Sequence, residues 1–166
     1  MRRHVFLLGM PGCGKSSLAT FLGKETGVPV VDTDHEIEKL AGSSVSEIWN
    51  SIGENGFRAL ERSILFRTIN GPSSLVSTGG GLPCFFDNMA LMSEFDTVFL
   101  DLSEEVLLDR NQNRDLPLLR EAENKMEAIR VLRSRRLFWY QAAPYIFDPE
   151  LGQERFLNFF KSHFLD

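Results

Sequence analysis

Residues 9–16 read GMPGCGKS and constrain the fold more than any other stretch of this chain, because they match the pattern G-x-x-x-x-G-K-[ST]. The short apolar run HVFLLG, residues 4–9, leads into them and predicts a buried strand. Residues 15–26 follow with apolar side chains at helical spacing, and Gly27 is a suitable residue to end that helix. The strand, glycine-rich turn and helix occur in the order that a phosphate-binding loop requires.

The residue types in this loop suit a nucleoside triphosphate and Mg²⁺. Glycines let the backbone curl so that N–H groups point at phosphate oxygens, and the helix N-terminus adds a partial positive charge. We expect Lys15 to reach the β- and γ-phosphates and the Ser16 hydroxyl to bind Mg²⁺. The pattern does not by itself distinguish hydrolysis, phosphoryl transfer and switching. The other predicted nucleotide-binding residues of the loop are Gly12, Cys13, Gly14 and Ser17.

Strand-like and helix-like patterns alternate along the remainder of the chain, which is typical of a parallel sheet with helices on both faces. We therefore predict an α/β fold with three layers, αβα, and a five-stranded parallel sheet. Without an internal repeat or linker, the sequence predicts a single domain over residues 1–166. The further strands are expected at 28–31, 74–78, 96–102 and 145–148, and the further helices at 35–41, 44–51, 53–70, 103–110, 121–141 and 152–164.

Composition excludes several classes of function. The net charge of −5 argues against a general nucleic-acid binder, which normally carries a basic excess. No apolar stretch approaches the roughly 20 residues of a membrane span, and the N-terminal apolar run is too short for a secretion signal. Cys13 and Cys84 form no metal-binding pattern; a disulfide between them stays open, but reduced thiols are the simpler interpretation. We expect a cytoplasmic monomer without nucleic-acid or membrane partners.

Two further features follow strands of the predicted sheet, at the edge where ligands bind in such folds. Asp32 and Asp34 come directly after the second strand, and three glycines, residues 79–81, come after the third. Aspartate is also a preferred residue at a helix start, so a capping role is an alternative for the two acids. Consecutive glycines allow a ligand to approach the backbone closely, although a flexible turn would use them too.

The segments DTD, GFRALE (56–61), TGGG and RRLFWY (135–140), in this order behind the phosphate loop, resemble the shikimate kinase family. The resemblance runs from about residue 4 to about residue 150. It implies the P-loop kinase fold with strand order 2-3-1-4-5, an acceptor-binding helical segment at about 33–61 and a short lid at about 111–120. It also implies transfer of the γ-phosphoryl group of ATP to the 3-hydroxyl of shikimate, a step of aromatic amino-acid biosynthesis.

The resemblance assigns the acceptor carboxylate to two arginines, Arg58 and Arg136. A guanidinium group matches a carboxylate in two hydrogen bonds and so fixes its orientation. Glu61 lies three residues after Arg58 on the same predicted helix, where it can hold that arginine in place. Trp49 and Phe57 match aromatic positions of the pocket wall, with core packing as the alternative. In the glycine turn, Gly80 would offer its N–H to the acceptor, while Gly79 and Gly81 shape the backbone.

The implied chemistry is an in-line phosphoryl transfer, in which positioning and charge stabilisation do most of the work. Lys15 would neutralise charge on the phosphates. Asp34 would accept a hydrogen bond from the attacking hydroxyl and take its proton, and Asp32 would support Mg²⁺ through water. Arg110 matches a position that packs on adenine, with a solvated helix end as the alternative. Cys13 could be oxidised at its helix N-terminus, but a space-filling role is the simpler interpretation.

The lid departs from the family pattern at one position. The family carries an arginine directly before Pro-Leu-Leu, and this chain has Leu116 there. Arg114 and Arg120 flank the segment, and we expect Arg114 to supply the missing charge as a catalytic residue with Lys15 and Asp34. A gluconate-type kinase and a nucleoside monophosphate kinase share the loop and the sheet and stay open as alternatives. The departure at Leu116 adds a third, a nucleotide-binding regulatory protein with weakened catalysis.

Overall fold

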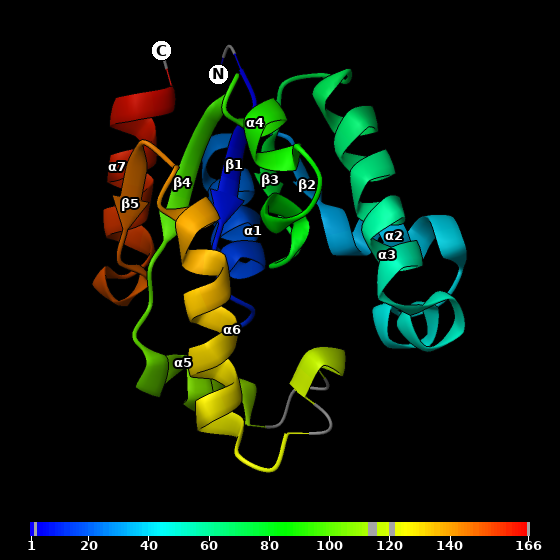
Figure 1. Cartoon of the computed structure of the whole chain (residues 1–166). Coiled ribbons are helices and arrows are strands. Elements are labelled where there is room, and N and C mark those ends of the chain that lie inside the picture. Colours follow the sequence, from blue (N-terminus) through cyan, green and yellow to red (C-terminus); the bar gives the residue numbers. More distant parts are fainter. Residues whose placement is uncertain (2, 113–115, 120–121, 166) are drawn as a thin grey trace.

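The computed structural model describes residues 1, 3–112, 116–119 and 122–165 (Figure 1). Its centre is a sheet of five parallel strands in the order β2-β3-β1-β4-β5, as the family resemblance implied. This order puts the first strand in the middle of the sheet, so the loop that follows β1 lies between the loops that follow β3 and β4. The strands are β1 (Val5–Leu8), β2 (Val30–Asp32), β3 (Leu75–Ser77), β4 (Asp96–Leu100) and β5 (Tyr145–Phe147).

Helices connect the strands, as the alternating pattern predicted. Gly27 ends the first helix with a left-handed backbone, φ 72°, and Ser103 caps the fifth by accepting the N–H of Val106. The described part of the chain holds no helix long and apolar enough to cross a membrane. The helices are α1 (Lys15–Thr26), α2 (Thr33–Ala41), α3 (Val45–Ile69), α4 (Asn88–Met92), α5 (Glu104–Asn111), α6 (Lys125–Tyr140) and α7 (Gln153–Phe164), with single 3₁₀ turns at Leu82–Cys84, Pro117–Leu119 and Pro149–Leu151.

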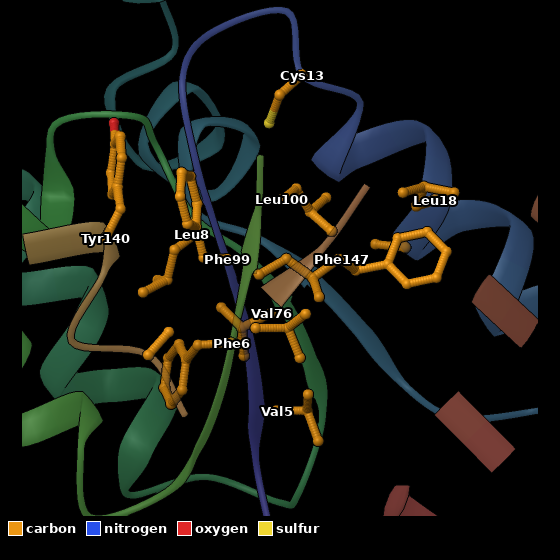
Figure 2. Close-up of a cluster of buried hydrophobic side chains, with 14 of the residues drawn as sticks. Val5, Phe6, Leu8, Cys13, Leu18, Val76, Phe99, Leu100, Tyr140 and Phe147 are labelled. Carbon is orange, nitrogen blue, oxygen red and sulfur yellow. The ribbon is translucent and has the colours of Figure 1, made fainter. Parts of the chain in front are cut away.

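The main core lies on both faces of the sheet. All four residues of β1 are fully buried, which explains why this strand is a continuous apolar run instead of an alternating one. Figure 2 shows Phe6 and Leu8 on the side that holds Tyr140 of α6, and Val5 on the side of Leu18 of α1. Successive side chains thus point to opposite faces, and each face is covered by a helix.

Several element boundaries differ by a few residues from the sequence-based expectation; for example, β4 ends at Leu100 instead of residue 102. Strand β2 begins at Val30 instead of residue 28, because Pro29 has no N–H for the ladder and offers only its carbonyl, to the N–H of Leu75 at 2.9 Å. The helices expected at 44–51 and 53–70 run together as α3, but Gly53 interrupts them with φ 68° and ψ −179°. The short helix α4 was not expected, since five residues give too little periodicity to recognise.

Candidate active site

The carboxyl ends of β1, β2 and β3 surround a cavity of about 620 Å³. The loop after β1, Asp34 after β2 and Gly80 after β3 all contribute to its wall. This is the edge at which open parallel sheets bind ligands. Of the predicted nucleotide-binding residues, the cavity is lined by Gly12, Gly14, Lys15, Ser16, Ser17 and Arg110.

The loop adopts a conformation that needs glycine at three positions. Gly9, Gly12 and Gly14 have φ 145°, 82° and 104°, which side chains rarely adopt. Lys15 is buried behind them, and its ammonium group donates hydrogen bonds to the carbonyls of Gly9 at 2.8 Å and Met10 at 3.0 Å. The loop therefore holds one fixed positive charge beside its own curled backbone.

Asn111, at the end of α5, ties that helix to the loop and was not expected from the sequence. Its side-chain amide donates to the carbonyls of Pro11 at 2.9 Å and Leu107 at 2.7 Å. A Cβ atom on Gly12 would lie only 2.6 Å from this amide nitrogen, so the close approach also requires glycine. The neighbouring Arg110 is exposed and donates to the carbonyl of Gly12 at 3.4 Å. No local pattern could reveal a contact that joins residues about a hundred positions apart.

Cys13 differs from the other loop residues, because its side chain is fully buried and faces the core below the loop (Figure 2). Its sulfur packs against Gly9, where a Cβ atom would lie 2.8 Å away. The burial favours the space-filling interpretation, and within the loop the sulfur also accepts a hydrogen bond from Lys15 Nζ at 3.6 Å. Cys13 and Cys84 are both free thiols.

Asp32 caps α2 and also contacts the start of α1, one with each carboxylate oxygen. One carboxylate oxygen accepts the N–H groups of Asp34 at 3.1 Å and His35 at 3.2 Å, which caps α2. The other accepts the hydroxyl of Ser16 at 2.7 Å, and the hydroxyl of Ser77 lies 3.2 Å from that same Ser16 oxygen. The cap thus fixes a carboxylate next to the first hydroxyl of α1. The side-chain groups that meet here are one carboxylate and two hydroxyls, so each could offer an oxygen to a metal ion.

Asp34 lies on the cavity side of α2, next to the glycine turn. A Cβ atom on Gly79 would come within 2.6 Å of the Asp34 carboxylate, so only glycine fits at this position of the turn. Burial raises the pKa of Asp34 to about 6, with a further contribution from the charge of Asp32, while Lys15 opposes the shift. A carboxylate with this pKa is still ionised at neutral pH and is a better proton acceptor than an ordinary aspartate.

A second, smaller pocket of about 90 Å³ adjoins the first, and the two share Pro11, Asp34, Gly80 and Leu116 as lining residues. The smaller pocket brings together residues from α2, α3, the glycine turn, the lid and α6. The structure thus gathers residues that are up to about a hundred positions apart in the chain. The predicted acceptor-binding residues all line it: Asp34, Arg58, Gly79, Gly80, Gly81 and Arg136.

Arg58 is nearly buried and held by two glutamates of its own helix. Its Nη1 donates to Glu61 at 2.7 Å, as the spacing predicted, and its Nε and Nη2 donate to Glu54 at 3.3 and 3.0 Å. Glu54 was overlooked, although its i, i+4 spacing to Arg58 is a recognisable signal. Gly81 is required here too, because a Cβ atom would overlap the guanidinium group.

Arg136 is 5% exposed, and its Nη1 has no hydrogen-bond partner among the described residues. This nitrogen lies beside the backbone of Gly80, 3.1 Å from where a Cβ atom would be. One helical turn further along α6, the buried hydroxyl of Tyr140 donates to the carbonyl of Gly80 at 2.5 Å. A buried cationic nitrogen without a partner is costly, and an anionic ligand in the pocket would offset that cost.

Glu61 and the two aromatic residues complete the pocket wall. Burial raises the pKa of Glu61 to about 7; the charge of Asp34 adds to this shift and the nearby Arg58 opposes it. The rings of Trp49 and Phe57 have centroids 5.4 Å apart, and both residues line the pocket. Phe57 also belongs to a small core cluster, so pocket wall and core packing are both observed for it.

The lid contributes Leu116 and the 3₁₀ turn Pro117–Leu119 to the wall of the smaller pocket. Leu116 also lines the larger cavity, so the residue at the family's arginine position lies where the two spaces meet. Its side chain brings no charge to that point. The two candidate replacements, Arg114 and Arg120, fall outside the described residues.

Comparisons with known proteins agree with this geometry. The family model for shikimate kinase matches residues 11–160. A shikimate kinase from Bacteroides thetaiotaomicron is 35% identical over 157 residues, covering 92% of this chain and 90% of that protein. The crystal structure of shikimate kinase from that organism has a TM-score of 0.87 at 32% identity, covering 96% of this chain and 97% of the other.

A second solved structure is the shikimate kinase from Acinetobacter baumannii in complex with shikimate. It has a TM-score of 0.86 at 28% identity and covers 99% of this chain and 96% of the other. The matched segment includes the phosphate loop from residue 11 onward, the glycine turn and both buried arginines. Sequence motifs, strand order, pocket geometry and these relatives lead to one conclusion: the chain belongs to the shikimate kinase family.

Proposed function

We propose that this protein transfers the γ-phosphoryl group of ATP to the 3-hydroxyl of shikimate. The observation that carries the proposal is the joining of two pockets, a phosphate-loop cavity and a smaller pocket with two buried arginines, at Asp34 and Gly80. An acceptor anchored by its carboxylate would present a hydroxyl to the junction. The named relatives, one of them solved with shikimate, support the same acceptor.

In this proposal the larger cavity takes ATP. Backbone N–H groups of the loop and Lys15 bind the phosphates, and Arg110, exposed at the end of α5, packs on the adenine. Lys15 would exchange its bonds to the loop carbonyls for phosphate oxygens, which strengthens the attraction as negative charge develops.

Ser16 and Asp32 fit a bound Mg²⁺. A hydroxyl and a carboxylate 2.7 Å apart are hard oxygen donors, which Mg²⁺ prefers, and the metal usually keeps several waters. We infer that Ser16 binds the metal directly and Asp32 through water. When bound, the metal supplies positive charge to the phosphate oxygens.

The smaller pocket takes the acceptor. Arg58 and Arg136 would bind the carboxylate, and the N–H of Gly80 and the walls formed by Trp49 and Phe57 would orient the ring. Asp34, at the junction, would accept a hydrogen bond from the attacking hydroxyl and take its proton as the phosphoryl group transfers.

The pKa of Asp34 predicts the acid side of the pH–rate profile. Because the carboxylate must be ionised to accept a proton, and its pKa is raised to about 6, kcat/KM for shikimate should be level above that pH. Below it, kcat/KM should fall by about tenfold per pH unit. Steady-state kinetics between pH 4.5 and 8 would measure this. A profile that stays flat down to pH 5 would contradict the assignment of Asp34 as base.

Arg114 is our candidate for the charge that Leu116 does not supply. Arginines that reach a transferring phosphate are worth about 10³- to 10⁵-fold in kcat in the best-studied cases, so Arg114→Ala should lower kcat by at least about tenfold. Arg120→Ala is the matched comparison and should leave kcat within about threefold. If neither substitution lowered kcat, the idea that a flanking arginine replaces the lid arginine would fail.

Acceptor specificity separates the proposed function from its alternatives. Wild-type protein with MgATP should release ADP with shikimate, and kcat/KM should be at least about 10³-fold lower with gluconate or AMP, which do not match two arginines set for one ring carboxylate. Preference for gluconate or AMP would favour the other kinase classes. ATP binding without turnover of any acceptor would favour the regulatory role that the uncharged Leu116 raises.

We also propose that the protein works in the cytoplasm as a monomer, without nucleic-acid or membrane partners. The net charge of −5 supports the absence of nucleic-acid partners, which normally require a basic excess. Both pockets are lined by residues of one chain, so a second copy is not needed to complete the site.

A further inference from the structure

The guanidinium group of Arg58 is held by hydrogen bonds and also by a cation–π contact. Glu54 and Glu61 accept from its nitrogens, and its carbon lies over the ring of Phe85, 4.3 Å from the ring centroid. The corresponding distances to Trp49 and Phe57 are longer, 5.2 and 5.7 Å. Phe85 therefore makes the tightest aromatic contact of this arginine.

Phe85 does not line either pocket of the site, whereas Trp49 and Phe57 do line the smaller one. Its ring is partly buried, in the segment that follows the glycine turn. Phe85 is thus placed to affect a ligand in the smaller pocket through Arg58, with which it is in contact. This separates it from the pocket-wall aromatics, which would touch the ligand themselves.

The segment that carries Phe85 is fixed to the helix that carries Arg58. One turn after Arg58 on α3, Arg62 donates to the side-chain oxygen of Asn88 at 2.7 Å and forms an ion pair with Asp87. The amide of Asn88, which is fully buried, donates in turn to the carbonyl of Leu82 at 2.8 Å. These bonds fix the backbone on both sides of Phe85, so the position of Phe85 is set independently of Arg58.

The orientation of the Arg58 plane decides which donors reach the pocket. A guanidinium group has five N–H donors in a planar fork, and the bonds to Glu54 and Glu61 use one on each nitrogen. One further N–H remains on each terminal nitrogen for another acceptor, and a carboxylate can accept two such hydrogen bonds. The ring of Phe85 lies directly under the guanidinium carbon, where it can restrict tilting of the plane about the bonds to the two glutamates.

We infer that Phe85 is a positioning residue for the acceptor carboxylate, because its ring holds the plane of Arg58 in the orientation that binds the carboxylate in two hydrogen bonds. The inference rests on the proposed transfer to shikimate and adds a residue to it. Guanidinium groups stack readily on aromatic rings, and such contacts strengthen where water is partly excluded. The stack also covers one face of a buried cation that would otherwise need solvent.

Substitutions at Phe85 and its neighbour test this inference. In Phe85→Ala and Phe85→Leu, KM for shikimate should rise by about 5- to 30-fold, with kcat within about threefold and KM for ATP unchanged. Phe85→Tyr keeps the ring face and should behave as wild type. The matched control is Phe86→Ala, because Phe86 is exposed and stacks on Arg62 instead, with 5.3 Å to its ring centroid. This control should leave all kinetic constants unchanged.

Unchanged KM for shikimate in Phe85→Leu would overturn the inference, since leucine preserves apolar volume but has no ring face. An equal loss in Phe85→Tyr would also overturn it, because the stack would then not be the cause. If Phe85→Ala fails to fold, as judged by its circular dichroism and melting midpoint, the leucine and tyrosine variants decide alone. A folded wild-type protein inactive towards shikimate would refute the proposed function instead, and with it the inference.

Discussion

Replacing Asp34 with Asn is expected to lower kcat for shikimate phosphorylation by about 10²- to 10⁴-fold, the usual contribution of a positioned proton acceptor. Asparagine has the same shape and can still accept a hydrogen bond, but it cannot take the proton of the attacking hydroxyl. KM for ATP should stay within about threefold, because in the proposed mechanism the loop and Lys15 bind the phosphates. The acid limb of the pH profile near pH 6 should disappear with the carboxylate.

The matched control is Glu36→Gln, which makes the same change of charge two residues along α2. Glu36 forms a long ion pair with the exposed Lys39, at 3.8 Å, and is absent from the described lining of both pockets of the site. Its kinetic constants should match those of the wild type. If Asp34→Asn retained kcat within about threefold while Glu36→Gln did the same, Asp34 would not be the base.

Replacing Arg136 with Met should raise KM for shikimate by about 10²- to 10³-fold. Truncating one partner of a buried, hydrogen-bonded charge pair costs about 2–5 kcal/mol, and each 1.4 kcal/mol corresponds to tenfold in affinity. In the protein without ligand, the same substitution removes a buried nitrogen that has no partner among the described residues, so the melting temperature should hold or rise. Opposite effects on ligand affinity and on stability would mark Arg136 as a binding residue.

Arg135→Met is the control for this prediction, because Arg135 is exposed on the same helix. It removes an equal charge from the molecule without touching the pocket. Steady-state kinetics and calorimetric titration with shikimate would compare the two variants. Equal KM values for Arg136→Met and wild type would exclude Arg136 as a ligand of the carboxylate.

Features set by neighbouring residues could be predicted from the sequence. The phosphate loop, the caps at Gly27 and Ser103, and the pairing of Arg58 with Glu61 depend on residues within a few positions of each other, and the structure confirms them. The role of Asp32 was harder to predict, because aspartate suits both a helix cap and a carboxylate near a metal ion. The structure shows the cap and the contact to α1 together, one on each oxygen.

Features that depend on tertiary contacts could not be predicted from the sequence. Asn111 reaches the loop across about a hundred residues, and Tyr140 reaches the carbonyl of Gly80 across sixty. Phe85 gave no signal, since its partner lies on another element and its segment has no periodicity. The start of β2 was misjudged for a local reason, the missing N–H of Pro29, which propensity arguments for a valine-rich run do not weigh.

The most direct test of the central claim is the identity of the phosphorylated product. Purified protein would be incubated with MgATP and shikimate, and the product examined by ³¹P–¹H correlation spectroscopy while ADP is quantified. The account predicts one phosphate ester per ADP, with its phosphorus coupled to the proton on C3 of shikimate. ADP accompanied only by inorganic phosphate, or an ester at another hydroxyl, would contradict it.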